Sequence, residues 1–285
     1  MPGKPLQIFK LPSSVFYIII CRDLNHILFY KGVIMANEIK LIEDLSLNAW
    51  PSHQMQIYDS WILRFSYFYT HRTNSVEQLG PSTIPLDEKI AYCESIYRDW
   101  GTPCIFKINP FLVPSFDAML EKRHYEIEHT TDVMVMPISD QISPVPDVPV
   151  ILDPVIHADW ISSLFDLKGM TNKIHRQIVP SMYRAIPKRT IAAHIEMDGR
   201  YVATGLGILD RDYIGIYAIH VDPAYRRRHF AEAICKSILI QGRRQGAKKA
   251  YLQVVAGNAP ARTLYEKLGF SELYTYWFRV SPYYI

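Results

Sequence analysis

Three consecutive arginines, Arg226, Arg227 and Arg228, stand between an apolar stretch and a helical pattern. The apolar stretch, Tyr213–Val221, predicts a strand, and the residues from Ala231 onward predict a helix. The first N–H groups of a helix lack internal partners and carry partial positive charge, and arginine adds forked donors that suit phosphate. This arrangement predicts a site for the diphosphate of a nucleotide-like cofactor.

Two polar side chains near the C-terminus are further candidates for chemistry. Asn258 precedes a predicted helix at 260–268, and Tyr265 lies inside that helix, in the segment LYEKLGF. A phenol can donate a proton to a leaving group. Each residue also has an ordinary structural interpretation, because Asn258 after Gly257 is typical of a turn and Tyr265 is typical of a core position. The arginines alone are equally typical of a solvated surface.

The elements that must position these residues alternate between helix and strand. Strands are predicted at 60–68, 70–76, 104–108, 131–136, 190–197, 201–210, 213–221, 250–255 and 273–280. Helices are predicted at 85–100, 115–122, 159–166, 170–181, 231–241 and 260–268. Asp198 and Gly199 predict a two-residue hairpin turn. The pattern favours a mixed α/β protein.

A weak internal repeat connects the two halves of the chain. The segment YEKLGF at 265–270 has a counterpart, LEKRHY, at 120–125, and the same shift aligns Gly101 with Gly246. This register predicts a duplication. At 81–86 the first copy has PSTIPL, whose prolines have no N–H to offer an anion. The first copy is therefore predicted to lack the anion site and to act structurally, either burying a sheet edge or forming one wall of the cleft, in preference to binding a separate ligand.

Prolines concentrated between 137 and 154 predict a linker. The predicted organisation is an N-terminal extension at 1–35, a degenerate copy at 36–137, the linker at 138–149 and the functional domain at 150–285. The extension is interpreted as disordered or as an incorrectly assigned start, in preference to a signal anchor. Its apolar run is too short and too interrupted for a membrane helix.

Composition excludes several classes of protein. The chain has 285 residues, is 49% hydrophobic and carries a net charge of +3, which is typical of a globular protein and too slight for nucleic-acid binding. The cysteines are scattered at Cys21, Cys93, Cys104 and Cys235, without the spacing of a disulfide framework or zinc site. They favour a reducing compartment, the cytoplasm. No metal and no membrane partner are expected.

Taken together, Tyr213 to Ala231, Asn258 and LYEKLGF resemble the GNAT superfamily of acetyl-CoA-dependent N-acetyltransferases. The resemblance covers 190–280 and extends more faintly to the first half. It implies two GNAT-like domains, each a twisted, mostly antiparallel sheet flanked by helices. In the family's phosphate loop, R/Q-x-x-G-x-G/A, the ends are Arg226 and Ala231. His229 occupies a glycine position, a departure that implies weaker cofactor binding or a shifted loop.

The resemblance implies acetyl-CoA as co-substrate. The residues implied to bind it are Ile219, His220, Val221, Arg226, Arg227, Arg228, His229, Phe230, Ala231, Asn258 and Tyr265. Asn258 would contact the pantetheine amides, and a backbone N–H near Ile219 would meet the oxyanion. Tyr265 would be the catalytic general acid that protonates the departing thiolate.

The general base stays open at this stage. Some family members place a glutamate on the central strand, where this chain offers Gly215 and Tyr217. The candidates are an ordered water or one of Asp212, Tyr217, His220, His194 and Glu196. Strand alternation predicts that Tyr217 and Ile219 share a face and that His220 points to the other.

The function implied is acetyl transfer to a primary amine by direct attack, with a small molecule or peptide as acceptor and a homodimer as one expected state. The alternative is a non-catalytic acyl-CoA-binding or partner-binding module, favoured by His229 and the missing base. Nucleic-acid binding is disfavoured by the low net charge. The acceptor region, 159–181 together with the wall formed by the first copy, mixes apolar and polar residues and indicates neither a strongly acidic nor a strongly basic pocket.

Overall fold

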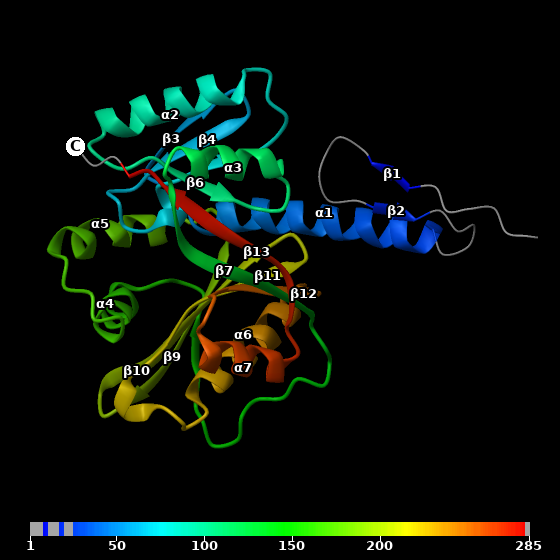
Figure 1. The fold of residues 1–285 in the computed structure, drawn as a ribbon. Helices are drawn as coiled ribbons and strands as arrows, with labels where there is room; N and C mark the ends of the chain where they lie inside the picture. The colour runs from blue at the N-terminus through cyan, green and yellow to red at the C-terminus, as the bar shows by residue number, and fades with distance from the viewer. Residues whose placement is uncertain (1–7, 11–16, 20–24, 283–285) are drawn as a thin grey trace, which may run out of the picture.

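The structure, a computed structural model, describes residues 8–10, 17–19 and 25–282 (Figure 1). Its helices are α1 (Asn25–Ala49), α2 (Leu86–Asp99), α3 (Pro114–Lys122), α4 (Ala158–Leu167), α5 (Lys173–Arg184), α6 (Phe230–Arg244) and α7 (Ala259–Leu268), with short 3-10 helices η1 (His71–Thr73) and η2 (Pro223–Tyr225). Its strands are β1 (Ile8–Lys10), β2 (Tyr17–Ile19), β3 (Gln54–Tyr58), β4 (Trp61–Phe65), β5 (Val76–Gln78), β6 (Ile105–Ile108), β7 (Glu126–Pro137), β8 (Ile151–Asp153), β9 (Arg189–Met197), β10 (Arg200–Asp210), β11 (Tyr213–Val221), β12 (Lys249–Val255) and β13 (Ser271–Val280).

One mixed sheet runs through the molecule. Its eleven strands lie in the order β3-β4-β5-β6-β13-β7-β12-β11-β10-β9-β8. The pairs β5–β6 and β11–β12 are parallel, and the remaining neighbours are antiparallel. Strands and helices alternate as predicted, so the mixed α/β architecture is confirmed.

The two halves of the chain exchange their last strands at the centre of this sheet. Strand β7, from the first half, pairs with β12, where Tyr251 is opposite Val135. Strand β13, from the second half, pairs with β6, where Phe278 is opposite Lys107. The strand order outward from β13 matches that outward from β7, as a duplication would produce. The halves therefore share one sheet, while the duplication and the domain boundaries stay predictions.

Some local features differ from the prediction. The strand predicted at 70–76 is wrong, because η1 and a turn occupy most of it. The side chain of Thr70 accepts a hydrogen bond from the Arg72 N–H at 3.1 Å, and that of Asn74 accepts one from the Ser66 N–H at 2.6 Å. Such local bonds compete with a strand ladder. Elements α1, β3 and β8 were not predicted.

The predicted extension at 1–35 falls partly outside the described residues, which begin again at residue 25. Helix α1 starts at Asn25 and continues through Met35 to Ala49, so Met35 lies within a helix. From Ile39 onward the helix is part of the core, with Ile42 and Leu45 fully buried against β11, β12 and β13. Residue 35 therefore lies inside α1, and the domain boundary predicted there stays a prediction.

Helices cover both faces of the C-terminal half of the sheet. Helices α6 and α7 pack on one face of β9 to β12, and α4 and α5 pack on the other face of β9 and β10. A Cβ atom at Gly205 would clash with Ile234 and lie 2.7 Å from Ile219. Glycine there lets α6 approach β10 closely, which places the start of α6 beside the end of β11 (Figure 1).

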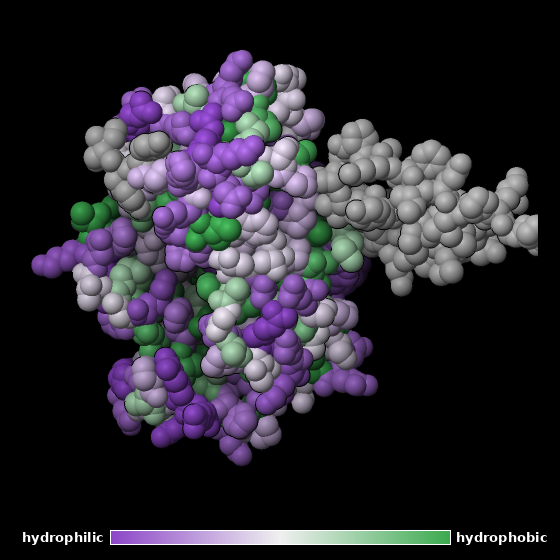
Figure 2. Space-filling model, viewed as in Figure 1, coloured by the Kyte–Doolittle hydropathy of each residue, from purple (hydrophilic) through white to green (hydrophobic). Residues whose placement is uncertain are grey.

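Cys93, Cys104 and Cys235 are buried and form no disulfide. Among the helices that the structure describes, none combines the length and apolar composition needed to cross a membrane. On the face viewed in Figure 2, hydrophilic and hydrophobic residues are interspersed, and the apolar areas stay small and separate. That face therefore gives no support to the predicted homodimer, which stays a prediction.

Candidate active site

Strands β11 and β12 separate from one another midway along their length. Their parallel pairing runs from Tyr213 opposite Lys249 to Ile216 opposite Leu252 and continues no further, although both strands do. On its other side β11 stays paired with β10 as far as Val221. The edge of residues 217–221 that faces β12 is thus open. Such an edge can pair with an extended ligand as a further strand would.

A β-bulge lies in this open segment. Ala218 has a φ of 51°, and the register with β10 shifts between Thr204 and Leu206. Tyr217, Ala218 and His220 consequently line one cavity, while Ile219 packs in the core beneath α6. The predicted shared face of Tyr217 and Ile219 is wrong, because a bulge adds one residue and reverses the alternation that follows.

The arginine loop joins β11 to α6 through η2. The backbone N–H groups of residues 227–232 donate no hydrogen bond within the described part of the chain. Consecutive free N–H groups in a turn that opens a helix form an anion-binding concavity. Arg226, Arg227 and Arg228 form no ion pair with any described residue, and the guanidinium of Arg228 lies 5.0 Å from the ring of Tyr225. The loop therefore offers free donors, and the anion site itself stays a prediction.

His229 keeps the backbone shape of the glycine that it replaces. Its φ is 59°, in the left-handed region, and Arg227 has a φ of 61°. The His229 side chain is 71% exposed, and its Nδ1 lies 3.0 Å from Oε2 of Glu232. Histidine enters this region more readily than most residues. The loop thus forms its turn with a histidine at the helix N-cap.

His229→Gly is expected to tighten acetyl-CoA binding severalfold and to leave stability within about 1 kcal/mol of wild type. Relief of left-handed strain, about 1–2 kcal/mol, is offset by the entropy that glycine adds to the unfolded chain. Without a Cβ, the loop backbone can approach the anion more closely. Calorimetry and urea unfolding measure the two effects. Glu232→Gln, which removes only the side-chain partner, is the control, and equal affinities in all three proteins contradict the expectation.

Asn258 and Tyr265 lie at the start and inside of α7. Asn258 caps this helix, with Oδ1 accepting from the Ala261 N–H at 3.3 Å, so the ordinary turn interpretation holds and the pantetheine contact stays a prediction.

Tyr265 is 9% exposed, and its hydroxyl has no partner among the described residues. Burial raises the pKa of Tyr265, followed by a smaller effect of Cys235 on α6. The phenol is therefore protonated at neutral pH.

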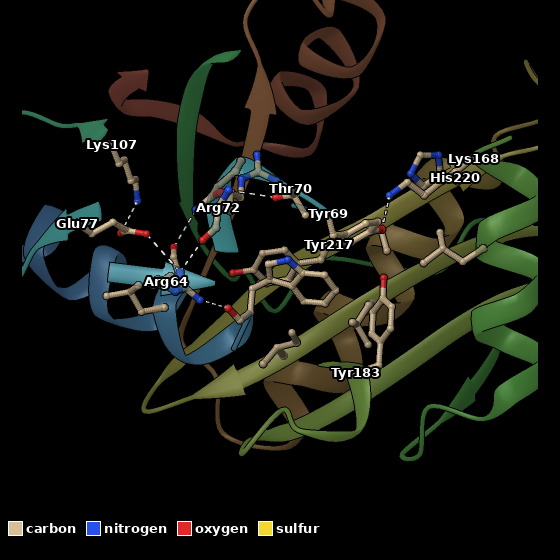
Figure 3. Close-up of a pocket in the computed structure, with 18 residues that line it drawn as sticks. Arg64, Tyr69, Thr70, Arg72, Glu77, Lys107, Lys168, Tyr183, Tyr217 and His220 are labelled. Atoms are coloured by element: carbon tan, nitrogen blue, oxygen red, sulfur yellow. Dashed lines mark hydrogen bonds and ion pairs between the residues drawn. The ribbon is translucent and has the colours of Figure 1, made fainter. Parts of the chain in front are cut away.

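A cavity of about 240 Å³ adjoins the point where β11 and β12 separate (Figure 3). Its lining comes from both halves of the chain: Ser46, Leu47, Trp50, Arg64, Tyr69, Thr70, Arg72, Glu77, Leu164, Lys107, Lys168, Tyr183, Leu206, Ile208, Tyr217, Ala218, His220 and Gln253. Sequence reasoning missed the charged residues that the first half contributes. The available signal was a charge inside an apolar strand, as at Arg64 in WILRF and Lys107 in IFKI.

Of the candidates for general base, Tyr217 and His220 line the cavity, and Asp212 and His194 do not. Asp212 lies in the turn before β11, at the end opposite to the open edge, and His194 is on β9. Tyr217 and His220 remain at the cavity. A Cβ at Gly215 would lie 2.6 Å from the Tyr217 ring, so a glutamate would not fit without displacing that ring.

His220 is an uncharged imidazole at neutral pH. Burial lowers the pKa of His220 to about 4, and Lys168 and Arg226 add to the shift. Its ring nitrogens have no hydrogen-bond partner among the described residues. A neutral imidazole with a free nitrogen can accept a hydrogen bond from an incoming amine.

The native state should lose stability as the pH falls from about 6.5 toward 4. An unfolded histidine takes up its proton near pH 6.5, whereas the folded pKa of His220 is about 4, so acid favours the unfolded chain. His220→Gln should weaken this pH dependence. Urea midpoints at pH 7 and pH 5 provide the measurement. His71 and His194 also have lowered pKa values and leave a residual dependence. An unaltered difference between the two pH values would remove His220 from this role.

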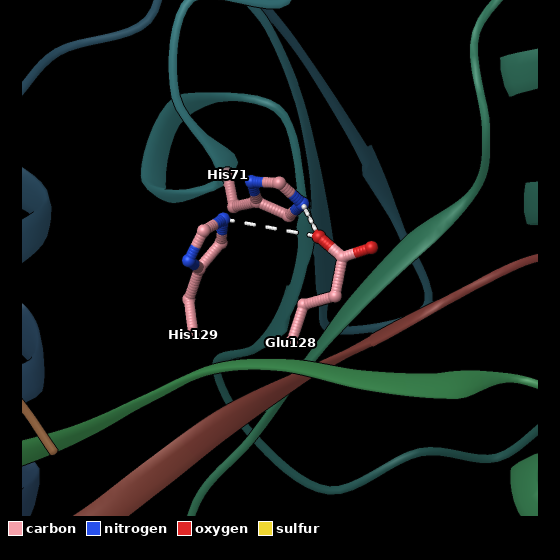
Figure 4. A group of neighbouring side chains, drawn as sticks. All are labelled: His71, Glu128 and His129. Carbon is pink, nitrogen blue, oxygen red and sulfur yellow. Dashed lines mark ion pairs between the residues drawn. The ribbon is translucent and has the colours of Figure 1, made fainter. Parts of the chain in front are cut away.

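One group of described side chains has the spacing of metal ligands (Figure 4). Oε2 of Glu128 lies 3.1 Å from Nε2 of His71 and 3.8 Å from Nε2 of His129. The His129 side chain is 55% exposed. These contacts between imidazole and carboxylate account for the spacing, so no metal is assigned, and the predicted absence of a metal stays a prediction.

Comparison with known proteins places this geometry in a family. A family model described as the probable histone acetyltransferase Rv0428c C-terminal matches residues 36–278. The chain is 22% identical over 248 residues to an uncharacterized N-acetyltransferase, YobR, of Bacillus subtilis, covering 86% of this chain and 99% of that protein.

Solved structures share the fold. A GCN5-related N-acetyltransferase from Kribbella flavida superposes with a TM-score of 0.64 at 15% identity, covering 86% of this chain and 95% of the other. A tandem GNAT protein from the clavulanic acid biosynthesis pathway superposes with a TM-score of 0.57 at 11% identity, covering 73% of this chain and 76% of the other. At these identities the likeness concerns the fold alone.

Proposed function

Because the chain belongs to the family of the probable histone acetyltransferase Rv0428c C-terminal region, within the GNAT superfamily, we propose that it transfers the acetyl group of acetyl-CoA to a primary amine. The family makes it an acyltransferase; the acetyl donor and the amine acceptor are the proposal. The observation that carries it is the open edge of β11 leading directly to the free N–H groups of residues 227–232. The pantetheine arm of acetyl-CoA requires an open strand edge, and its diphosphate requires free N–H groups at the end of that edge.

The residues present fit acetyl-CoA. The N–H groups of residues 227–232, with Arg226 and its two neighbours, would hold the diphosphate. The open edge of residues 217–221 would hold the pantetheine arm, which is amide-rich and pairs like a strand. When bound, acetyl-CoA supplies an acetyl group activated as a thioester.

Three side chains would control proton transfer and the protonation state of the acceptor amine. Tyr265, neutral because burial raises its pKa, would donate a proton to the departing thiolate. The acceptor amine must be uncharged to attack. Lys168 lines the cavity beside His220, and a nearby cation lowers the pKa of an amine. The surroundings thus favour the neutral amine, so a strong base is not required before the attack. After the attack the nitrogen would pass its proton to His220, and solvent would take that proton up and return one to Tyr265.

Two measurements test the proposal. Calorimetry should detect saturable acetyl-CoA binding, and a thiol assay over a library of amines should detect release of CoA with some of them. Binding without thiol release from any amine would favour the alternative, a non-catalytic acyl-CoA-binding module. Absence of acetyl-CoA binding contradicts both.

A further inference from the structure

The cavity beside the open edge carries an excess of positive charge. The positively charged lining residues are Arg64, Arg72, Lys107 and Lys168, and the negatively charged one is Glu77. His220 adds no charge at neutral pH. The sequence expectation of a pocket without marked charge is incorrect, because most of these cations come from the first half.

Two of the cations are already paired. The guanidinium of Arg64 lies 3.3 Å from Glu77, and the ammonium of Lys107 lies 3.3 Å from Glu77 and 2.7 Å from Glu43. These four side chains form one buried network in which positive and negative charges balance. The excess therefore resides in Arg72 and Lys168.

Arg72 has no carboxylate partner among the described residues. Its Nε donates to Oη of Tyr276 at 2.9 Å, and that hydroxyl donates to Oε1 of Gln253 at 3.0 Å. The two Nη atoms have no hydrogen-bond partner in the described part of the chain, although the side chain is at least half-buried. In Figure 3 it lies among the residues that line the cavity. The guanidinium is thus held through Nε by Tyr276, and its two Nη atoms stay available to a ligand in the cavity.

Lys168 lies on the same cavity, after the end of α4. Its Nζ donates to Oη of Tyr69 at 3.0 Å and forms no ion pair with any described residue. Lys168 is exposed, so water screens its charge, whereas the Arg72 guanidinium is at least half-buried without a compensating anion, which is costly. A ligand that brings a negative charge removes that cost, and a guanidinium fork matches the two oxygens of an oxyanion.

Resting on the proposed acetyl transfer, we propose that the acceptor is a small amine that also carries an oxyanion, a carboxylate or a phosphate. Arg72, assisted by Lys168, holds the oxyanion, and the amine reaches the open edge of β11 beside His220. The cavity volume of about 240 Å³ suits a small molecule. A polyamine or a lysine-rich tail would add positive charge to a cavity that already has an excess.

Matched acceptor pairs test this inference. Amino acids and amino phosphates are compared with their amides and with neutral amines of similar size, using CoA release to obtain kcat/KM. The anionic member of a pair should be favoured at least tenfold, since hydrogen bonds to charged groups contribute about 1.5–3 kcal/mol. A preference for carboxylates or for phosphates identifies which oxyanion is recognised.

Substitutions of Arg72 test whether this residue causes the preference for anionic acceptors. Arg72→Met should lower kcat/KM for the anionic acceptors about 10- to 100-fold, a loss that corresponds to one charge-assisted contact, and leave the neutral acceptors unchanged. Arg72→Lys should retain part of the preference, because it keeps the charge and loses the fork. Arg211→Met, at a surface arginine 50% exposed, is the matched control. Melting temperatures establish that each variant is folded.

The outcomes separate the inference from the proposed function. Equal or better acetylation of neutral amines or lysine peptides overturns the oxyanion site and leaves acetyl transfer standing. A preference for anions that survives Arg72→Met overturns the assignment to Arg72. Acetyl-CoA binding without turnover of any anionic amine contradicts the inference, and failure to bind acetyl-CoA at all contradicts the proposed function itself.

Discussion

Tyr265→Phe is expected to lower the turnover number about 100-fold while leaving the dissociation constant for acetyl-CoA within about twofold, because a positioned general acid contributes about 10²- to 10⁴-fold. The substitution removes one oxygen atom from a side chain that packs beside Phe270 in the core. Its hydroxyl has no partner among the described residues, so no hydrogen bond within that part of the protein is lost. The effect should therefore appear in the chemistry and not in the fold.

Steady-state kinetics with the best amine and calorimetry with acetyl-CoA measure the two quantities. Tyr213→Phe is the matched control, because Tyr213 lies at the far end of β11 and its hydroxyl contacts Glu38 instead of the cavity. The wild-type rate should not decline on the basic side before about pH 10, since burial raises the pKa of Tyr265 above its ordinary value. An unchanged turnover number in Tyr265→Phe would exclude Tyr265 as the acid.

Lys107→Met is expected to reduce the free energy of unfolding by about 3–5 kcal/mol, the usual cost of removing one partner from a buried ion pair. The Lys107 side chain is 4% exposed and joins Glu43 on α1 to Glu77 on β5. Without the ammonium, Glu43 is left in the core with neutral partners, Asn109 and Tyr274. The substitution thus leaves a largely buried carboxylate without a cation.

Urea unfolding at pH 7 measures this loss. The double variant Lys107→Met/Glu43→Gln should recover part of it, because the carboxylate left without a cation is then neutral. Burial lowers the pKa of Lys107, but Glu43 and Glu77 outweigh that effect and raise it above the unfolded value. The contribution of Lys107 is therefore complete below about pH 10 and is lost as the pH rises further. A loss under about 1 kcal/mol in the single variant contradicts the expectation.

Local patterns were sufficient for much of the C-terminal half. The strand Tyr213–Val221 was predicted with its observed ends, and the turn at Asp198 and Gly199 forms the expected hairpin, with Met197 opposite Arg200. These features depend on residue types within a few positions of one another, which the sequence displays directly. The same holds for the arginine loop that begins α6.

Longer-range features were not accessible in this way. The bulge at Ala218 depends on the register with β10 and reversed the predicted direction of His220. The exchange of β7 and β13 joins segments more than a hundred residues apart, and no local pattern specifies such a pairing. The strand predicted at 70–76 failed because side chains of Thr70 and Asn74 bond to the local backbone.

By itself the sequence determined that a strand, three arginines and a helix start follow one another at 213–231, and the free N–H groups follow from the helix that begins there; the anion site built on them stays a prediction. Only the tertiary structure decided which side chains line the cavity beside the open edge of β11. The shared sheet brings Arg72, from a half predicted to be structural, to the cavity beside His220. No described carboxylate forms an ion pair with Arg72, and such pairing is set by positions in space, not along the chain.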